Sequence, residues 1–291
     1  MLNKELIKPY LNLYQTNPCY KNGKKDNFSD TIELTVQLTN KCNANCTFCS
    51  NSTFKDYNFN FEFFEEVLHT LMDISYIGKV AFTGGEPTLY PNFVDVVKYV
   101  CNLLPSTEIV INSNGSNLDK LEELVGNHIE FGISRHHYDD EKNFEIFKTK
   151  KVATTKQLFE FGEKENVLLH CNLIKGYIDN MNEAEKMAEY VYNLGIFRMG
   201  FVELLPYTEQ AIKDKVDIDI LKFPNSIVTR LGERKDICRC ANIKYKDILN
   251  IYMRYNISMG PKHRSLPNSP FVYNLNHLTH GFGGPLIWEC K

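Results

Sequence analysis

The feature that most constrains this chain is a regular alternation of short β-rich runs with longer stretches of helical periodicity, which begins near residue 33. Six such units follow one another, and their strand candidates are residues 34–38, 79–83, 108–112, 129–134, 167–174 and 197–204. Repeated βα units build a parallel sheet. Because six units are too few to close an eight-stranded barrel, the pattern predicts an α/β fold, an open partial (β/α)6 barrel over residues 33–206.

The helix after the second strand candidate shows the helical period most clearly. Its apolar residues, at positions 93, 96, 97, 100, 101 and 104, fall on one face. In barrels of βα units, functional groups lie where the strands end, at their carboxyl termini. We therefore expect the site among the loops that follow the strands.

Two segments flank the predicted barrel. Residues 1–32 are expected to form an N-terminal extension, and the repeats stop after Pro206. Residues 207–291 are expected to form an appended C-terminal segment that caps the barrel and is a candidate for substrate binding. No low-complexity linker separates these parts, so we expect no freely tethered domain.

Charge and hydropathy disfavour two classes of partner. The chain carries 33 Lys and Arg against 36 Asp and Glu, a net charge of -3, which gives no global attraction for nucleic acid. No apolar run approaches the roughly 18 residues of a membrane span, and the N-terminus lacks the apolar region of a secretory signal. We therefore expect a cytoplasmic protein with no membrane partner.

The nine cysteines are an odd number in a chain without a secretory signal, which favours metal ligands or reduced thiols over disulfides. Cys42, Cys46 and Cys49 form a CX3CX2C pattern in a polar loop just after the first strand. A structural zinc site normally takes four ligands, and no second cysteine pair lies nearby. Three thiolates would leave one iron of a four-iron, four-sulfur cluster open to a small molecule. Zinc or three unrelated thiols is the alternative.

This pattern resembles the hallmark of the radical S-adenosylmethionine (radical SAM) enzymes, in which an aromatic residue, here Phe48, precedes the last cysteine. Gly84, Gly85, Glu86 and Pro87 match the family's GGEP motif, which ends the second strand and contacts the amino group of the methionyl moiety. The resemblance implies a [4Fe-4S] cluster on the three cysteines, with S-adenosylmethionine as the second cofactor. On its own, GGEP is also compatible with a plain turn into a helix.

Further matches lie at the ends of later strands. Asn114, in Asn-Ser-Asn-Gly, resembles an element of the branch that contains the molybdenum-cofactor cyclisation enzymes. In the family, polar residues at the ends of the fourth and fifth strands hold the ribose and carboxylate of the cofactor. Ser134 and Asn172 are the corresponding candidates in this chain.

Other polar residues at strand ends are candidates for substrate contact or catalysis. Arg135, His136, His137 and Tyr138 directly follow the fourth strand, although adjacent histidines are also common at protein surfaces. Glu203 ends the sixth strand, where the resembling branch has an acidic residue. It either faces the lumen or forms a structural salt bridge.

The C-terminal segment is locally basic. Residues 230–264 contain nine basic and three acidic side chains, a balance of +6. Arg254, Lys262 and Arg264 are candidates to clamp a phosphate or carboxylate, and a solvated basic face is the alternative.

The cysteines of the C-terminal segment form no standard motif. Cys238, Cys240 and Cys290 either hold an auxiliary cluster, act as a hydrogen-atom donor, or are structural thiols. Tyr252 is a further candidate hydrogen-atom donor.

The resemblance implies an enzyme that cleaves S-adenosylmethionine reductively and uses the 5'-deoxyadenosyl radical to take hydrogen from a substrate. The favoured substrate is a small anionic metabolite, such as a nucleotide, a sugar phosphate or an amino-acid derivative. A flavodoxin or ferredoxin type protein would supply the electron. A peptide-modifying enzyme, a nucleic-acid-modifying enzyme and a non-catalytic iron-sulfur or zinc-binding protein are the alternatives.

Overall fold

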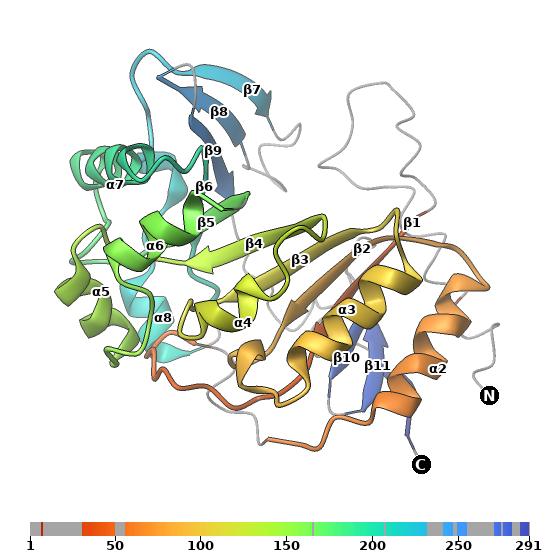
Figure 1. Ribbon diagram of the computed structural model, residues 1–291. Coiled ribbons are helices and arrows are strands. Elements are labelled where there is room, and N and C mark those ends of the chain that lie inside the picture. Colours follow the sequence, from red (N-terminus) through yellow and green to blue (C-terminus); the bar gives the residue numbers. More distant parts are fainter. Residues whose placement is uncertain are drawn as a thin grey trace.

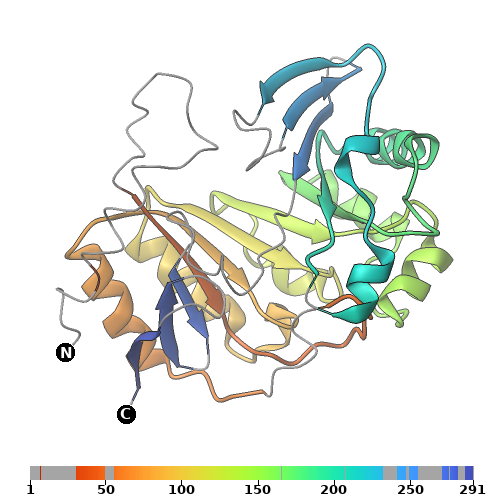
Figure 2. The same cartoon turned by 180° about the vertical axis from the view of Figure 1, so that it is seen from behind.

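The computed structural model describes residues 7, 31–49, 56–164, 166–206, 208–231, 241–246, 249–254, 271–274, 276–280 and 286–290. In these residues one curved sheet runs through the molecule, and helices cover its outer face (Figures 1 and 2). The opposite face of the barrel strands is called the lumen face below.

The middle of the sheet consists of six neighbouring strands in chain order, and each pairs with the next in parallel. They are β1 (Thr31–Gln37), β2 (Tyr76–Thr83), β3 (Glu108–Ser113), β4 (Ile129–Ser134), β5 (Val167–Leu173) and β6 (Arg198–Glu203). The first two strands begin three residues earlier than the sequence pattern indicated. The predicted α/β fold with an open partial barrel is confirmed.

A helix follows each of these strands. The α-helices are α2 (Phe61–Met72), α3 (Phe93–Leu103), α4 (Leu118–Glu122), α5 (Asp140–Phe147), α6 (Thr155–Gly162), α7 (Met181–Asn193) and α8 (Glu209–Asp214). Side-chain caps fix where several of them begin: Asn60, Asp139, Thr154 and Asn180 each accept a backbone N–H in the first turn.

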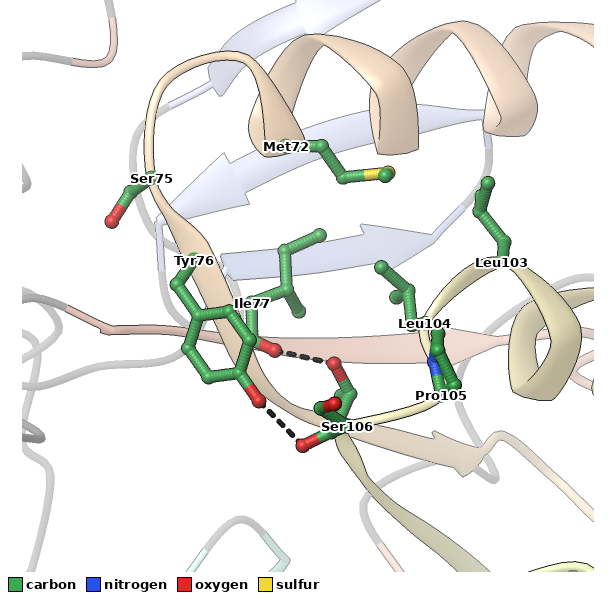
Figure 3. A pocket seen from close by; sticks show the side chains of 9 residues that line it. Met72, Ser75, Tyr76, Ile77, Leu103, Leu104, Pro105 and Ser106 are labelled. Carbon is green, nitrogen blue, oxygen red and sulfur yellow. Dashed lines mark hydrogen bonds between the residues drawn. The ribbon is translucent and has the colours of Figure 1, made fainter.

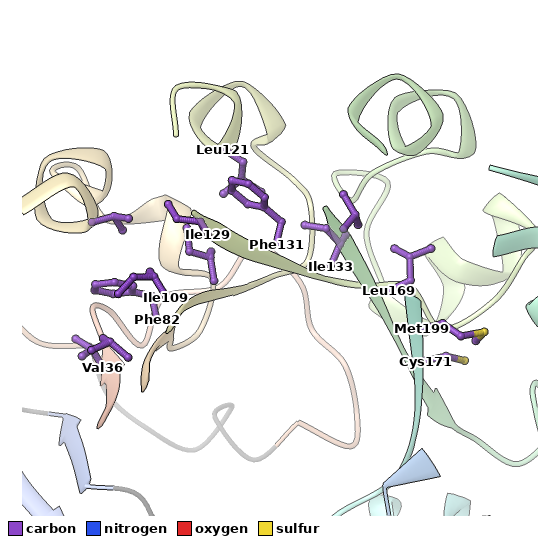
Figure 4. Close-up of a cluster of buried hydrophobic side chains, with 14 of the residues drawn as sticks. Val36, Phe82, Ile109, Leu121, Ile129, Phe131, Ile133, Leu169, Cys171 and Met199 are labelled. Carbon is purple, nitrogen blue, oxygen red and sulfur yellow. The ribbon is translucent and has the colours of Figure 1, made fainter. Parts of the chain in front are cut away.

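The core lies between the sheet and these helices. Alternate strand residues such as Phe82, Phe131 and Leu169 are fully buried, and Figure 4 shows their side chains on the helix side of the sheet. Burying one such side chain contributes roughly 1.5–3 kcal/mol. The residues between them therefore face the lumen, because successive strand side chains alternate in direction.

The C-terminal segment extends the sheet at both edges. Beside β6 lie β9 (Leu249–Arg254), β8 (Ala241–Tyr245) and β7 (Ile227–Leu231); beside β1 lie β10 (Phe271–Asn274), β11 (His277–His280) and β12 (Leu286–Glu289). The inner strand on each side, β9 or β10, is parallel to its barrel neighbour, and the outer strands are antiparallel. The described strands of the C-terminal segment thus continue the sheet of the barrel, and its capping role stays a prediction. The edge strands of an open barrel present unpaired backbone groups, and β9 and β10 pair with these edges.

A cavity of about 260 Å³ lies where α2 and α3 end and β2 begins (Figure 3). Its lining includes Met72, Ile77 and Leu104. The start of β2 is at the amino end of the parallel strands, opposite the end at which the cysteine and GGEP motifs lie. The cavity is therefore separate from the site described below. No described helix has both the length and the apolar character of a membrane span.

Candidate functional site

The three motif cysteines lie on one loop, residues 38–49, here called the cysteine loop, which leaves the carboxyl end of β1. Cys42 is exposed, Cys46 and Cys49 are partly buried, and none of the three forms a disulfide. Burial, with the neighbouring Cys49 and Cys42 thiols, raises the pKa of Cys46 to about 12. In the described residues no three Cys, His, Asp or Glu side chains converge on a common metal position. An all-thiol donor set on one short loop nevertheless has the chemistry that an iron-sulfur cluster requires.

Asp56 anchors the start of the cysteine loop. Its carboxylate accepts hydrogen bonds from the Thr39 hydroxyl at 2.8 Å and the Asn40 N–H at 3.1 Å, and pairs with Lys41 at 2.9 Å. Partial burial raises the pKa of Asp56, but the hydrogen bonds from Lys41 and Thr39 have the larger combined effect and lower it to about 2. Sequence analysis missed this residue because no motif marks it.

The two glycines of GGEP let the cysteine loop lie directly against the end of β2. The N–H groups of Gly85 and Glu86 donate to the Thr39 and Lys41 carbonyls, both at 2.8 Å. A Cβ on Gly84 would lie 2.2 Å from the Thr39 oxygen, and one on Gly85 would lie 2.1 Å from the Lys41 oxygen. Gly84 also has a φ of +144°, which residues with a side chain rarely adopt.

The Glu86 carboxylate is buried and bonded within the protein. It accepts hydrogen bonds from the Thr88 N–H and hydroxyl, the Ser113 hydroxyl at 2.9 Å and the Asn114 N–H at 2.7 Å. Burial raises its pKa, and these donors oppose the rise. The carboxylate thus ties the turn after β2 to the end of β3. That the GGEP motif contacts the amino group of the cofactor stays a prediction. Pro87 opens the 3-10 turn η5 (Pro87–Leu89).

Asn114 reaches from the end of β3 to the cysteine loop. Its side-chain amide N–H donates to the side-chain amide oxygen Oδ1 of Asn43 at 2.9 Å and lies 3.9 Å from the Cys42 sulfur. The next residue, Gly115, has a φ of +75°, so the chain turns sharply there. The third-strand motif, GGEP and the cysteine loop are therefore in contact at one end of the barrel.

Phe48 fixes the far part of the cysteine loop. It packs against a small apolar cluster of Ile146, Ile174, Leu204 and Ala211. Its ring meets the edge of His136 at 5.5 Å, and His136 stacks on Phe147 at 4.7 Å. The Asn172 N–H donates to Nδ1 of His136 at 3.2 Å. His136 therefore supports the loop as a buried, neutral ring; burial lowers its pKa to about 3.

Residues 135–137 are buried and Tyr138 is partly buried, so that substrate contact by this segment stays a prediction. Arg135 is fully buried and pairs with Asp140 at 2.6 Å. His137 is also fully buried, and the Tyr138 hydroxyl donates to Glu183 of α7 at 2.6 Å. These residues, with His136, bind the helices around the end of β4.

Glu203 forms the structural salt bridge, not the lumen contact. It is buried, its Oε1 accepts the Ile218 N–H at 2.8 Å, and its Oε2 lies 3.2 Å from the Lys215 ammonium. Glu203 thereby holds the segment after α8 against the end of β6.

Ser134 and Asn172 are partly exposed on the lumen face. Cys171 and Leu173, which flank Asn172, are fully buried in the core, so Asn172 points the other way. His170 lies one position further into the same face and pairs in register with Ser134. No sequence motif marks His170.

The remaining candidates belong to the C-terminal segment. Tyr252 and Arg254 lie on β9, and their neighbours Ile251 and Met253 are buried. Cys290 accepts a hydrogen bond from the Asn60 amide at 3.4 Å. The other four candidates, Cys238, Cys240, Lys262 and Arg264, lie outside the described residues. The auxiliary cluster stays a prediction.

The buried His136 predicts a stability that depends on pH. Its folded-state pKa of about 3 is below the ordinary value of 6.5, so between these values the unfolded chain binds more protons. The contribution of His136 to stability is then fully present above about pH 6.5 and falls by about 1.4 kcal/mol per pH unit below it, in addition to the contributions of His137 and His170. Urea unfolding at about pH 7 and about pH 5.5 measures this slope. His136→Gln should reduce it by that amount; an unchanged slope contradicts the assignment.

Three comparisons with known proteins agree with this geometry. The family model of the radical SAM superfamily matches residues 36–193. Among curated proteins, the GTP 3',8-cyclase of Clostridium perfringens strain SM101 is 28% identical over 77% of this chain and 72% of its own length. A tungsten-containing aldehyde ferredoxin oxidoreductase cofactor-modifying protein of Pyrococcus furiosus is 23% identical over 67% of this chain and 58% of its own length.

Solved structures share the fold. Streptococcus suis SuiB bound to the precursor peptide SuiA matches with a TM-score of 0.55 and 21% identity, over 65% of this chain and 43% of that one. Members of the superfamily use a [4Fe-4S] cluster and S-adenosylmethionine, so the prediction of both cofactors is confirmed. The resemblance to the cyclisation branch is confirmed as well. Because the family model spans more than half of the chain, this protein is an enzyme of the radical SAM superfamily.

Proposed function

We propose that this enzyme cleaves S-adenosylmethionine reductively and uses the 5'-deoxyadenosyl radical to take a hydrogen atom from a small anionic metabolite. One observation carries the proposal: three thiols that form no disulfide lie on a loop that is hydrogen-bonded to the GGEP turn and to Asn114, at the carboxyl end of the barrel strands.

The ligands of the cluster would be Cys42, Cys46 and Cys49, because they are the thiols of that loop. When bound, the cluster and S-adenosylmethionine supply a carbon-centred radical after one electron enters from a flavodoxin or ferredoxin type protein. The protein's own part is to hold the loop in place. Asp56 fixes its start, Phe48 its end, and Gly85 the contact with β2.

Ser134 and Asn172 are the residues we propose for the ribose and carboxylate of S-adenosylmethionine. A hydroxyl and a primary amide can both donate and accept hydrogen bonds, which suits these groups. Both side chains are partly exposed on the lumen face, at the end of the strands where the cysteine loop lies.

The substrate class rests on charge and on the relatives. Arg254 lies on the lumen face of β9, and the relatives in Clostridium perfringens are named GTP 3',8-cyclases, which marks an anionic small molecule as their substrate. A peptide is the second candidate, because the similar SuiB structure contains a precursor peptide; at 21% identity that likeness supports the fold alone.

The test is substrate-dependent formation of 5'-deoxyadenosine by the anaerobically reconstituted enzyme with S-adenosylmethionine and dithionite. Nucleoside triphosphates, sugar phosphates, amino-acid derivatives and a mixture of short peptides are compared. We expect one of the small anions to accelerate formation and to appear in an altered form by mass spectrometry. Acceleration by peptides only would replace the small-molecule proposal with the peptide-modifying one.

A further inference from the structure

Three polar side chains share the lumen face of the strands β5, β6 and β9. In the parallel register His170 is level with Gly200, and Gly200 with Tyr252; one step closer to the carboxyl end, Val202 is level with Arg254. Residues paired in a parallel sheet point to the same side. His170, Tyr252 and Arg254 therefore face the same space, just inside the strand ends.

Two glycines make room for the His170 ring. A Cβ on Gly132 of β4 would lie 3.0 Å from its Nε2, and one on Gly200 of β6 would lie 3.2 Å from its Nδ1. The imidazole thus lies along the sheet between its two neighbouring strands. In the described part of the chain neither ring nitrogen has a hydrogen-bond partner, and the residue is only partly buried. As far as the described residues go, its polar atoms can meet a ligand in the lumen.

The charges around His170 are positive. Burial, then Arg254, Lys79 and Arg198, lower its pKa to about 4, so the ring is neutral near pH 7. Two of these cations already have carboxylate partners: Lys79 pairs with Glu108 and Arg198 with Glu130.

Arg254 differs from the other two cations. Its guanidinium donates to the neutral Asn242 amide oxygen at 2.8 Å, and within the described residues no carboxylate pairs with it. A guanidinium has five N–H donors in a planar fork, so most of them remain for an oxyanion.

Tyr252 places this guanidinium. The ring centroid lies 5.1 Å from the Arg254 guanidinium carbon and 5.6 Å from that of Arg198. Its hydroxyl oxygen accepts from Arg198 at 3.3 Å, which leaves the hydroxyl proton available to donate.

We infer that Arg254, Tyr252 and His170 form an anion-binding subsite in the lumen that takes the phosphate or carboxylate group of the substrate. Arg254 supplies the charge and the paired N–H donors, Tyr252 supplies an O–H, and the neutral imidazole supplies one N–H. The term substrate rests on the proposed function, whereas anion binding can be measured without it. His170 and Tyr252 thus join Arg254 in one subsite, which holds the anionic group against the barrel wall.

The experiment is a titration of the cluster-reconstituted full chain with inorganic phosphate, and separately with succinate, followed by NMR of 13C-labelled histidine. The His170 signal is identified by its loss in His170→Asn. We expect a saturable shift of that signal, and about a tenfold weaker binding in Arg254→Gln, with a smaller loss in Tyr252→Phe. Lys156→Gln removes an exposed cation of α6 and should bind as the wild type does. Whichever of phosphate and succinate binds more tightly identifies the anionic group that the subsite takes.

Two results overturn the inference: no saturable shift with either probe, or equal affinity in Arg254→Gln and wild type. Iron content and far-ultraviolet circular dichroism show whether each variant folds. If Arg254→Gln does not fold, the comparison of affinities uses Tyr252→Phe, which keeps the aromatic ring. A parallel 5'-deoxyadenosine assay of the wild type separates the two claims. Anion binding without S-adenosylmethionine cleavage contradicts the proposed function alone, and cleavage without anion binding contradicts the subsite alone.

Discussion

Replacing Cys42, Cys46 and Cys49 together by alanine is expected to remove the bound iron and to reduce 5'-deoxyadenosine formation to background. Thiolates are the ligands of such clusters, and these three thiols lie together on the cysteine loop. Iron analysis, the visible absorption of the reconstituted protein and the dithionite-dependent assay measure this.

The matched control is Cys101→Ala, which removes a buried thiol from α3, away from the cysteine loop. It should retain the wild-type iron content. Iron that persists in the triple variant at the level of about one four-iron cluster contradicts the ligand assignment and points to the cysteines of the C-terminal segment.

The substitution Gly85→Ala is expected to be nearly as damaging, although it adds only one methyl group. The new Cβ would lie 2.1 Å from the Lys41 carbonyl oxygen and 2.5 Å from that of Asn40. Both contacts are with backbone, which cannot rotate away, so the cysteine loop must move off β2. A displacement of about 1 Å at a catalytic site costs on the order of 10²-fold in rate. We expect a loss of that size in 5'-deoxyadenosine formation, with reduced iron content.

The control variant Gly176→Ala introduces backbone strain without crowding, and it is compared with Gly85→Ala. Gly176 has a φ of +85° and nothing within 4 Å of its notional Cβ, so alanine there costs only the roughly 1–2 kcal/mol of a left-handed residue. This variant should keep its iron and its activity. Equal losses in the two variants would mean that lowered stability, not the contact with Lys41, causes the Gly85→Ala defect.

Local patterns in the sequence were sufficient to predict the barrel and its end. The six strands each carry an apolar period of two on the helix side, and the helix Phe93–Leu103 carries a period of 3.6, so each element could be recognised alone. The cysteine spacing and GGEP predicted the family because their chemistry is local to two loops. Asn114, which the sequence singled out at the end of the third strand, lies beside the cysteine loop, and its contact with the cofactor stays a prediction.

Residues whose role depends on where the folded chain directs their side chains were harder to predict. Arg135 and His136 directly follow β4, and no sequence pattern indicated that both side chains are buried. Asp56 lies in a stretch without periodicity, and its role exists only because the chain returns to Lys41. Proximity along the sequence gave no sign of either outcome.

The C-terminal segment was the least predictable part. Its strands β10 and β9 pair with the two edge strands of the barrel, β1 and β6. Strand β1 is more than a hundred positions away, and β6 already belongs to a βα unit of the barrel. The importance of His170 depends on Gly132, Gly200 and Arg254, which come from three different strands. Such a set is assembled by register, which the sequence pattern does not specify.

The most direct test of the account is the wild-type enzyme itself, reconstituted anaerobically with iron and sulfide and given S-adenosylmethionine and dithionite. The account predicts about four irons per chain on the cysteine loop and 5'-deoxyadenosine that forms only when the reductant is present. Zinc in place of iron, or no 5'-deoxyadenosine from a chain that carries its full cluster, would contradict it.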